Sequence, residues 1–150
     1  MFKHILVPVD GSEHAGRAVD IAGDLAQRYG AKVTLLHVLT QAGGYQVPSE
    51  LLAFEKIEHL RITEHDLIEG AGQEILTKAE QRARNHGAAD CATLLESGDP
   101  AGHVVQTANG QNVDLIVMGR RGLGDLGGLL LGSVSHKVSQ AVDCCCLTVK

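Results

Sequence analysis

The sequence predicts an α/β fold in which helices cover both faces of a five-stranded parallel β-sheet with the strand order 3-2-1-4-5. Short, almost continuously apolar segments alternate along the chain with longer segments whose apolar residues recur at helical spacing. Such apolar strands are typical of a parallel sheet that is buried between two layers of helices. The length of 150 residues and the 44% of hydrophobic residues are typical of one globular domain, residues 1–150.

The first strand and the first helix are predicted within residues 2–30. Residues 2–9 are dense in aliphatic side chains and are expected to form the strand. Ser12 is expected to cap the helix, because a serine oxygen accepts a hydrogen bond from a free N–H group of the first turn. The apolar positions of the helix are Ala15, Ala18, Val19, Ala22, Leu25 and Ala26. Gly30 fits the left-handed position just after the helix.

A second strand and a long helix are predicted next. Residues 32–39 form the strand, and residues 40–60, which contain two glycines and a proline, form a long and partly helical excursion. The helix that follows ends at Gly87. Its apolar positions recur at helical spacing and are Ile68, Ala71, Ile75, Ala79 and Ala83.

The third strand, residues 91–96, is predicted with a weaker pattern than the others. Asp99 and Pro100 then predict a helix start, because an aspartate caps the first turn and proline suits the first helical position. The buried side of this helix carries Val104, Val105 and Ala108. Residues 114–118 form the fourth predicted strand.

The last part of the chain begins with a glycine-rich loop, residues 119–132. Ser133 is expected to begin the final helix, and residues 145–149 form the fifth predicted strand. The apolar residues of the final helix are Val138, Ala141 and Val142.

The strand order is predicted from the place of two unusual segments. Right-handed crossovers allow both 3-2-1-4-5 and the flavodoxin-like order 2-1-3-4-5. Ligands of such sheets bind beyond the carboxyl ends of the strands, where the strand order reverses. In the order 3-2-1-4-5 this point brings residues 8–12 together with the glycine-rich loop. Pro8 agrees with this, because a proline is tolerated where strand pairing stops.

Charge and composition exclude several classes of function. Thirteen Lys and Arg against eighteen Asp and Glu give a net charge of −5, and aromatic residues are only 3%. The chain therefore lacks the basic surface and the stacking residues of a nucleic-acid-binding protein. No apolar run approaches the roughly 18 residues of a membrane span, and the apolar stretch at residues 5–9 is too short for a signal peptide. We expect a cytoplasmic protein that does not insert into membranes.

The glycine-rich loop predicts a phosphate-binding site. Glycines let backbone N–H groups approach a ligand, and a following helix N-terminus adds its positive dipole end. Ser133 could donate from its hydroxyl as well as cap the helix, and Arg120 or Arg121 could add positive charge. The loop is not a Walker motif, because no lysine precedes Ser133. On spacing alone, a surface loop whose glycines only permit turns is the alternative.

These motifs together resemble the universal stress protein family. The family's nucleotide motif is Gly, two residues, Gly, nine residues, Gly and then Ser or Thr, and the matching residues are Gly119, Gly122, Gly132 and Ser133. Further similar segments are residues 5–12, 36–38 and 114–119. The resemblance spans the whole chain and implies the ATP-binding branch of the family. The implied fold is Rossmann-like, of the adenine nucleotide alpha hydrolase type.

The resemblance also implies site residues. Asp10, which follows Pro8 and Val9, would lie near the ribose and phosphates, directly or through Mg²⁺ or Mn²⁺. The residues around the adenine, the ribose and the first phosphate would be Val38, Met118 and Gly119. The other phosphate-binding residues would be Gly122, Gly132, Ser133, Val134 and Ser135, with Arg121 as a weaker candidate. Asp10 could instead only cap the first helix turn, although Ser12 already serves there.

Three functions follow as hypotheses. The first is an ATP-binding regulatory protein whose loop at residues 119–132 becomes ordered with ATP and changes the surface offered to an unidentified protein partner. The second is a slow ATP hydrolase or phosphoryl-transfer enzyme, for which Asp10 could help to hold a metal and Lys137 is the nearby lysine. The third is a dimeric scaffold without nucleotide that senses oxidation through the cysteines at 144–146. His37 is expected to pack within its strand rather than to act as a catalyst.

The cysteines and the last strand carry two further expectations. Family members commonly pair their last strands antiparallel, so the resemblance implies a homodimer through residues 145–149, where Cys145 and Cys146 replace a usual Pro-Val. On a strand, Cys144 and Cys146 would face one side and Cys145 the other. We expect these three thiols and Cys91 to be buried and unreactive, because the sequence holds no CxxC motif.

Overall fold

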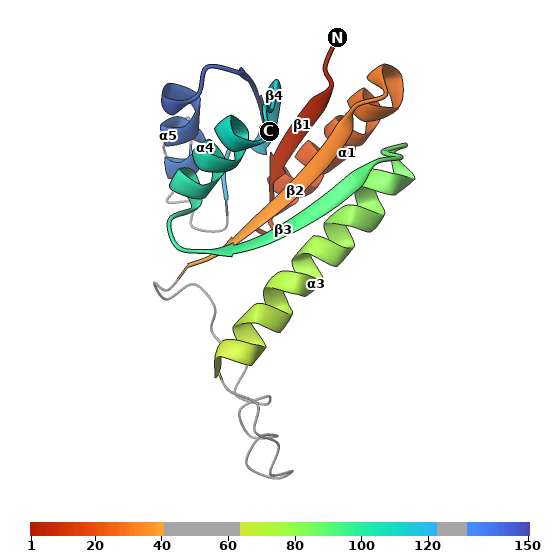
Figure 1. Cartoon of the computed structure of the whole chain (residues 1–150). Helices are drawn as coiled ribbons and strands as arrows, with labels where there is room; N and C mark the ends of the chain where they lie inside the picture. The colour runs from red at the N-terminus through yellow and green to blue at the C-terminus, as the bar shows by residue number, and fades with distance from the viewer. Residues whose placement is uncertain (41–63, 123–131) are drawn as a thin grey trace.

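The computed structural model describes residues 1–40, 64–122 and 132–150 (Figure 1). Its strands are β1 (His4–Pro8), β2 (Lys32–Leu39), β3 (Cys91–Ser97), β4 (Leu115–Gly119) and β5 (Cys145–Val149). Within the described residues they form one parallel sheet in the order β3-β2-β1-β4-β5. The predicted order 3-2-1-4-5 is confirmed, and the flavodoxin-like alternative is excluded.

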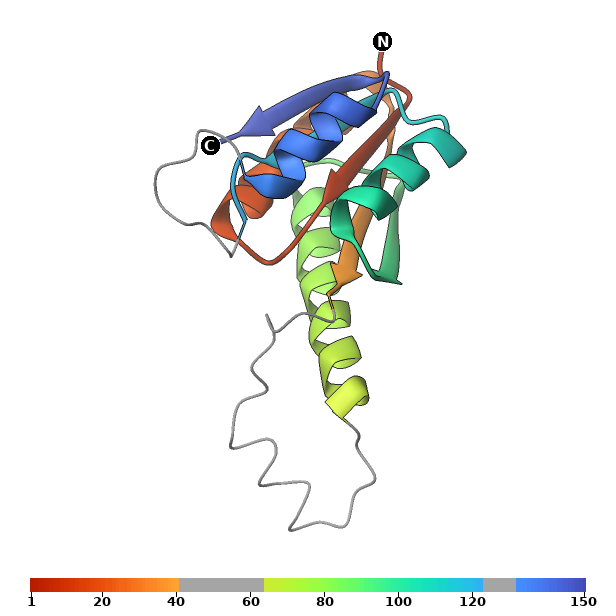
Figure 2. The same ribbon diagram turned by 90° about the vertical axis from the view of Figure 1, so that its left-hand side faces the viewer.

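Helices cover both faces of this sheet (Figures 1 and 2). The helices are α1 (Glu13–Tyr29), α3 (Glu64–Asn85), α4 (Pro100–Gly110) and α5 (Ser133–Ala141). Helices α1 and α3 lie on one face, and α4 and α5 lie on the other. The excursion predicted at residues 40–60 lies outside the described residues except for Thr40. In the described parts of the chain, no helix combines the length and the apolar character that crossing a membrane requires.

The predicted helix ends are confirmed at three positions. The Ser12 side chain accepts a hydrogen bond from the Ala15 N–H group at 3.2 Å, which caps α1. Gly30 follows α1 in the left-handed conformation, with φ of 64°. The Asp99 carboxylate accepts a hydrogen bond from the Gly102 N–H group at 2.8 Å, and Pro100 takes the first position of α4.

The first strand is shorter than predicted, because β1 begins at His4 rather than at residue 2. Phe2 instead places its ring edge-on against the ring of Tyr29, with 5.6 Å between the ring centroids. An apolar residue before a strand contributes to the same hydrophobic pattern whether it pairs in the sheet or packs beside it. The sequence pattern alone could not separate these two cases.

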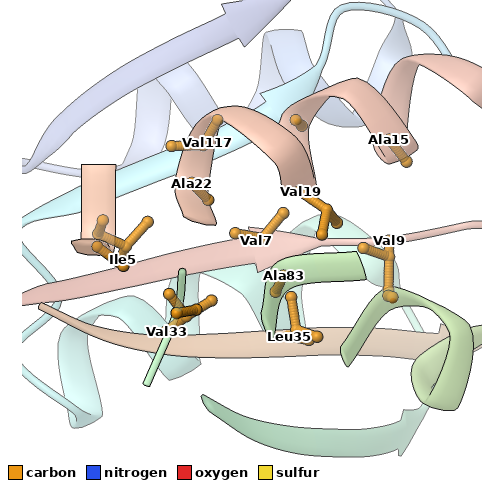
Figure 3. Close-up of a cluster of buried hydrophobic side chains, with 14 of the residues drawn as sticks. Ile5, Val7, Val9, Ala15, Val19, Ala22, Val33, Leu35, Ala83 and Val117 are labelled. Atoms are coloured by element: carbon orange, nitrogen blue, oxygen red, sulfur yellow. The ribbon is translucent and has the colours of Figure 1, made fainter. Parts of the chain in front are cut away.

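The core has two parts, one on each face of the sheet. Figure 3 shows the first part, where Val7 of β1 and Leu35 of β2 lie beneath Val19 of α1. The second part joins Leu6 of β1 to α4 and α5. Since successive strand residues point to opposite faces, β1 and its neighbours are buried on both sides. The carboxyl ends of β1 and β4 are therefore held on a rigid framework.

Side-chain hydrogen bonds connect the strands at the amino-terminal edge of the sheet, which is formed by the amino ends of the parallel strands. His4 Nε2 lies 2.8 Å from the hydroxyl of Thr34, and His4 Nδ1 lies 3.1 Å from the Gln111 carbonyl oxygen. The Asp114 carboxylate accepts a hydrogen bond from the Lys3 N–H group at 2.9 Å. These contacts join the starts of β1, β2 and β4 at one edge.

The cysteines near β5 alternate as predicted, but one of them corrects the expectation of burial. Cys144 and Cys146 are half-buried against the second part of the core, and burial raises the pKa of both thiols. Cys91 is also half-buried, and burial raises the pKa of its thiol to about 11. Cys145 is exposed, because it points to the face of β5 opposite to Cys144 and Cys146, where the neighbouring Leu147 is exposed as well. The prediction that all four thiols are buried is therefore wrong for Cys145.

Candidate functional site

The two segments that the sequence places at the carboxyl ends of β1 and β4 come together in the structure. Asp10 follows the end of β1, Gly122 follows the end of β4, and the two strands pair directly. A Cβ atom added to Gly122 would overlap Oδ2 of Asp10. A glycine at this position therefore lets the loop backbone approach the Asp10 carboxylate, and a side chain here would displace it.

Asp10 also shapes the turn between β1 and α1. Its Oδ1 atom accepts a hydrogen bond from the Ser12 N–H group at 2.9 Å. Gly11, between them, adopts the left-handed conformation with φ of 82°, which glycine accepts without strain. The local turn role that the sequence left open for Asp10 is therefore present, and the same carboxylate faces Gly122 through its other oxygen.

The end of β4 packs closely against the first turn of α1. A Cβ atom added to Gly119 would lie 2.9 Å from the Ala15 backbone nitrogen and 3.0 Å from Cβ of His14. Met118, the residue before Gly119, is only 3% exposed and packs into the second part of the core. Gly119 thus marks the point where the strand leaves the core and its backbone meets the start of α1.

The described ends of the glycine-rich loop are joined in a structure that we call the loop neck, formed by Arg120, Gly132 and Ser135. The Arg120 carbonyl oxygen accepts hydrogen bonds from the Gly132 N–H group at 2.7 Å and from the Ser135 hydroxyl at 3.0 Å. The Arg120 N–H group donates to the Val149 carbonyl oxygen at 2.6 Å, which ties the neck to β5. Residues 123–131 of the predicted loop lie outside the described residues.

The start of α5 corrects the expected role of Ser133. Gly132 is the N-cap residue, Ser133 is the first helical residue, and among the described residues no side chain caps the first turn. A capping oxygen must come from the residue before the helix, so Ser133 lies one position too late to cap it. The hydroxyl of Ser135 instead donates to the Gly132 carbonyl oxygen at 3.0 Å. The N–H groups of the first turn of α5 therefore have no side-chain acceptor in the part of the chain that the structure describes.

The remaining predicted site residues lie on the same edge of the sheet or just beneath it. Val9 is only 5% exposed, and its carbonyl oxygen lies 2.7 Å from Nδ1 of the buried His37, which agrees with a packing role for His37. Val38 and Val134 are half-buried against the second part of the core. The other residues are Pro8, the half-buried last residue of β1, and the half-buried Arg121.

Two residues at this edge were not among the predicted site residues. Within the described parts of the chain, His14 Nδ1 and Arg120 Nε are buried and have no hydrogen-bond partner. His14 lies in the first turn of α1, and this position follows from the predicted cap at Ser12. Its approach to Gly119 could not be foreseen, because it depends on the packing of α1 against β4. For Arg120, the sequence offered it only as an alternative to Arg121.

These residues fit a phosphate better than a resident metal ion. Buried imidazole and guanidinium nitrogen atoms without a partner in the described residues, together with the N–H groups of the first turn of α5, suit the oxygen atoms of a phosphate. In the described ranges, no group of three or more His, Cys, Asp or Glu side chains is placed to hold a metal ion. A metal at Asp10 would therefore need ligands besides the side chains of the described residues.

Comparison with known proteins gives a match over the full length. The profile described as the universal stress protein family matches residues 1–150. Universal stress protein YxiE of Bacillus subtilis is 35% identical over 151 residues, and the match covers 100% of both chains. A universal stress protein of Thermus aquaticus is 37% identical over 153 residues, again with 100% of both chains covered.

Solved structures with this fold are also similar. The universal stress protein UspA from Lactobacillus plantarum has a TM-score of 0.79 at 24% identity, and the match covers 99% of this chain and 98% of that one. This likeness concerns the fold. A universal stress protein solved in complex with cAMP has a TM-score of 0.69 at 28% identity, with 99% of this chain and 96% of that chain covered.

Proposed function

The chain belongs to the universal stress protein family, and from this premise we propose that it binds ATP at the carboxyl ends of β1 and β4 and acts as a regulatory protein. The observation that carries the proposal is the approach of Gly122 to the Asp10 carboxylate, which any side chain at position 122 would have to displace. The cAMP complex of a family member supports an adenine nucleotide as the ligand.

The phosphates would be bound chiefly by backbone N–H groups. In the first turn of α5, the N–H groups of Ser133, Val134 and Ser135 have no side-chain cap from the described residues, and the positive end of the helix dipole lies there. Gly132 contributes differently, because its own N–H group donates to Arg120 within the loop neck. We therefore assign Gly132 to holding the loop ends together and the first turn of α5 to phosphate binding.

Asp10 and the phosphates carry charges of the same sign. We propose that Mg²⁺ or Mn²⁺ enters with the nucleotide and is shared between the Asp10 carboxylate and phosphate oxygens, because the described residues do not supply a complete metal site. The metal would neutralise charge there. The hydrogen bond from the Ser12 N–H group to Oδ1 would keep the carboxylate oriented toward the ligand.

The adenosine part would extend along the same edge toward β2. Val38 lies at the carboxyl end of β2 and is half-buried, so its backbone and methyl groups are available to border the adenine. Met118 and Gly119 at the end of β4 would border the ribose. A nucleotide bound in this way changes the surface around residues 119–122, and we propose that a partner protein recognises this change.

Titration of the purified protein with ATP by calorimetry tests the proposal. We expect the wild type to bind and Gly122→Val to bind at least about tenfold more weakly, because a side chain there displaces the Asp10 carboxylate. Gly110→Val is the matched control, since a Cβ atom on Gly110 meets nothing within 4 Å. Absence of binding by the wild type at saturating ATP, or equal binding by both glycine variants, would contradict the proposal.

We also propose that two copies of the chain associate through the open edge of β5. This strand is the last in the sheet order, and Leu147 on it is 38% exposed. An open strand edge with apolar side chains favours pairing with another strand. Sedimentation equilibrium checks this proposal, and a monomer mass at every concentration would exclude the homodimer.

A further inference from the structure

The first turn of α1 contains a buried polar atom that the proposed function does not yet use. His14 Nδ1 is buried and has no hydrogen-bond partner among the residues that the structure describes. Its neighbours in the turn are satisfied: the Ser12 hydroxyl accepts from Ala15, and Glu13 pairs with Arg17. Burying a polar atom without a partner destabilises the fold, so native proteins rarely retain one without a reason.

His14 lies at the edge where the nucleotide is proposed to bind. A Cβ atom added to Gly119 would lie 3.0 Å from both Cβ and the carbonyl carbon of His14. Gly119 ends β4 and directly precedes Arg120 of the loop neck. His14 is therefore in contact with the same backbone that leads to Gly122 and the Asp10 carboxylate.

Arg120 presents a second buried donor at this edge. Its Nε atom is buried and has no hydrogen-bond partner in the described part of the chain. Its backbone is fixed on both sides, since its N–H group donates to Val149 and its carbonyl oxygen accepts from Gly132. Guanidinium groups are donors only and remain charged at all physiological pH values, so this atom needs an acceptor.

The chemistry of these atoms indicates which part of the nucleotide they bind. At the opposite edge of the sheet the unpaired buried atom is Oδ1 of Asp114, an acceptor, whereas His14 and Arg120 present nitrogen atoms. Phosphate oxygens are acceptors with negative charge and pair well with imidazole and guanidinium N–H groups. Resting on the proposed function, we infer that His14 and Arg120 are direct ligands of the nucleotide's phosphates.

The experiment compares ATP with adenosine, which lacks phosphates. We expect His14→Ala to weaken ATP binding about tenfold in calorimetry and to leave adenosine binding unchanged, because one charge-assisted hydrogen bond is lost. His14→Asn keeps an amide near the position of Nδ1 and is expected to recover most of the loss. Arg120→Gln is expected to give the same ATP-specific weakening.

His86→Ala is the matched control. His86 follows α3 and contacts Asp20 and Asp24 of α1, so this variant removes an imidazole from another part of the molecule. Equal ATP affinity in His14→Ala and the wild type would overturn the inference while the proposed function stands. Equal weakening of ATP and adenosine would also overturn it, since His14 would then shape the site without binding phosphate. A wild type that binds neither ligand would reject the proposed function itself.

Discussion

The two ends of the parallel strands, the amino-terminal edge and the carboxyl edge of the sheet, differ in the hydrogen bonds of their polar side chains. At the amino-terminal edge, both ring nitrogens of His4 have partners, and Asp114 accepts hydrogen bonds through Oδ2, while its buried Oδ1, an acceptor, has no partner in the described residues. At the carboxyl edge, buried nitrogens of His14 and Arg120 have no partner in the described residues, although the same strands supply both edges. Under the proposed function, the hydrogen bonds at the amino-terminal edge serve stability, whereas the unpaired nitrogen atoms at the carboxyl edge serve a ligand.

Gly119→Val is expected to have the largest effect, because it should reduce both the stability of the fold and the binding of ATP at the carboxyl edge. Its Cβ atom would lie 2.9 Å from the Ala15 nitrogen and 3.0 Å from the His14 carbonyl carbon, both of them backbone atoms that cannot rotate away. We expect a loss of about 3 kcal/mol in the free energy of unfolding, measured with urea, because β4 and α1 must move apart. ATP binding should be lost as well. An unchanged unfolding midpoint would show that this contact carries no stability.

His4→Ala would sharpen the comparison from the opposite edge. The substitution leaves the Thr34 hydroxyl, which is 1% exposed, without its partner. We expect the free energy of unfolding to fall by about 1.5 kcal/mol, the usual cost of an unpaired buried group, with ATP affinity unchanged. Adding Thr34→Val should recover part of the loss, because both partners are then removed. A weaker affinity for ATP in His4→Ala would argue against separate roles for the two edges.

The smallest effect is expected between α1 and α3, away from both edges. Hydrogen bonds from Arg82 hold the pKa of Asp20 below its usual value, and a nearby His86 lowers it further. A lowered carboxyl pKa stabilises the fold at neutral pH, and this contribution disappears as the pH falls through the lowered value. Both partners are partly exposed, so Arg82→Met should cost only about 1 kcal/mol at pH 7.

The pH dependence provides the check on that prediction. The difference in unfolding free energy between the wild type and Arg82→Met should shrink as urea unfolding is repeated from pH 7 down to about pH 2. ATP affinity at pH 7 should not change, which separates this pair from the carboxyl edge. A difference that stays constant in acid would mean that Asp20 is not the partner through which Arg82 stabilises the fold.

The fold could be predicted from the sequence to the level of strand order. Pro8 at a strand end and the glycines after another strand indicated which two strands are neighbours, and β1 and β4 do pair. Strand limits were less certain, because Phe2 is apolar yet packs against Tyr29 outside the sheet. The exposure of Cys145 did not follow from the predicted order alone, because Cys146 on the same edge strand is half-buried.

The candidate site could be predicted only where spacing in the chain was informative. Gly122 and the residues after β1 stood out because glycines and an aspartate follow strands directly. Ser133 was expected to cap α5, but Gly132 occupies that position, and sequence patterns do not fix a helix start to one residue. His14 depends on a contact with Gly119 from a distant part of the chain, which no local pattern reveals.

The loop neck has a consequence for variation in this protein. Because Arg120 bonds to Gly132 and Ser135, the residues that flank positions 123–131 are held together at a single anchoring point. The entropic cost of closing a loop rises only slowly with its length. Segments of other lengths and compositions at this point would therefore change the free energy of unfolding little. Insertions or substitutions at this point would therefore change the surface of the molecule and leave the β-sheet unaltered.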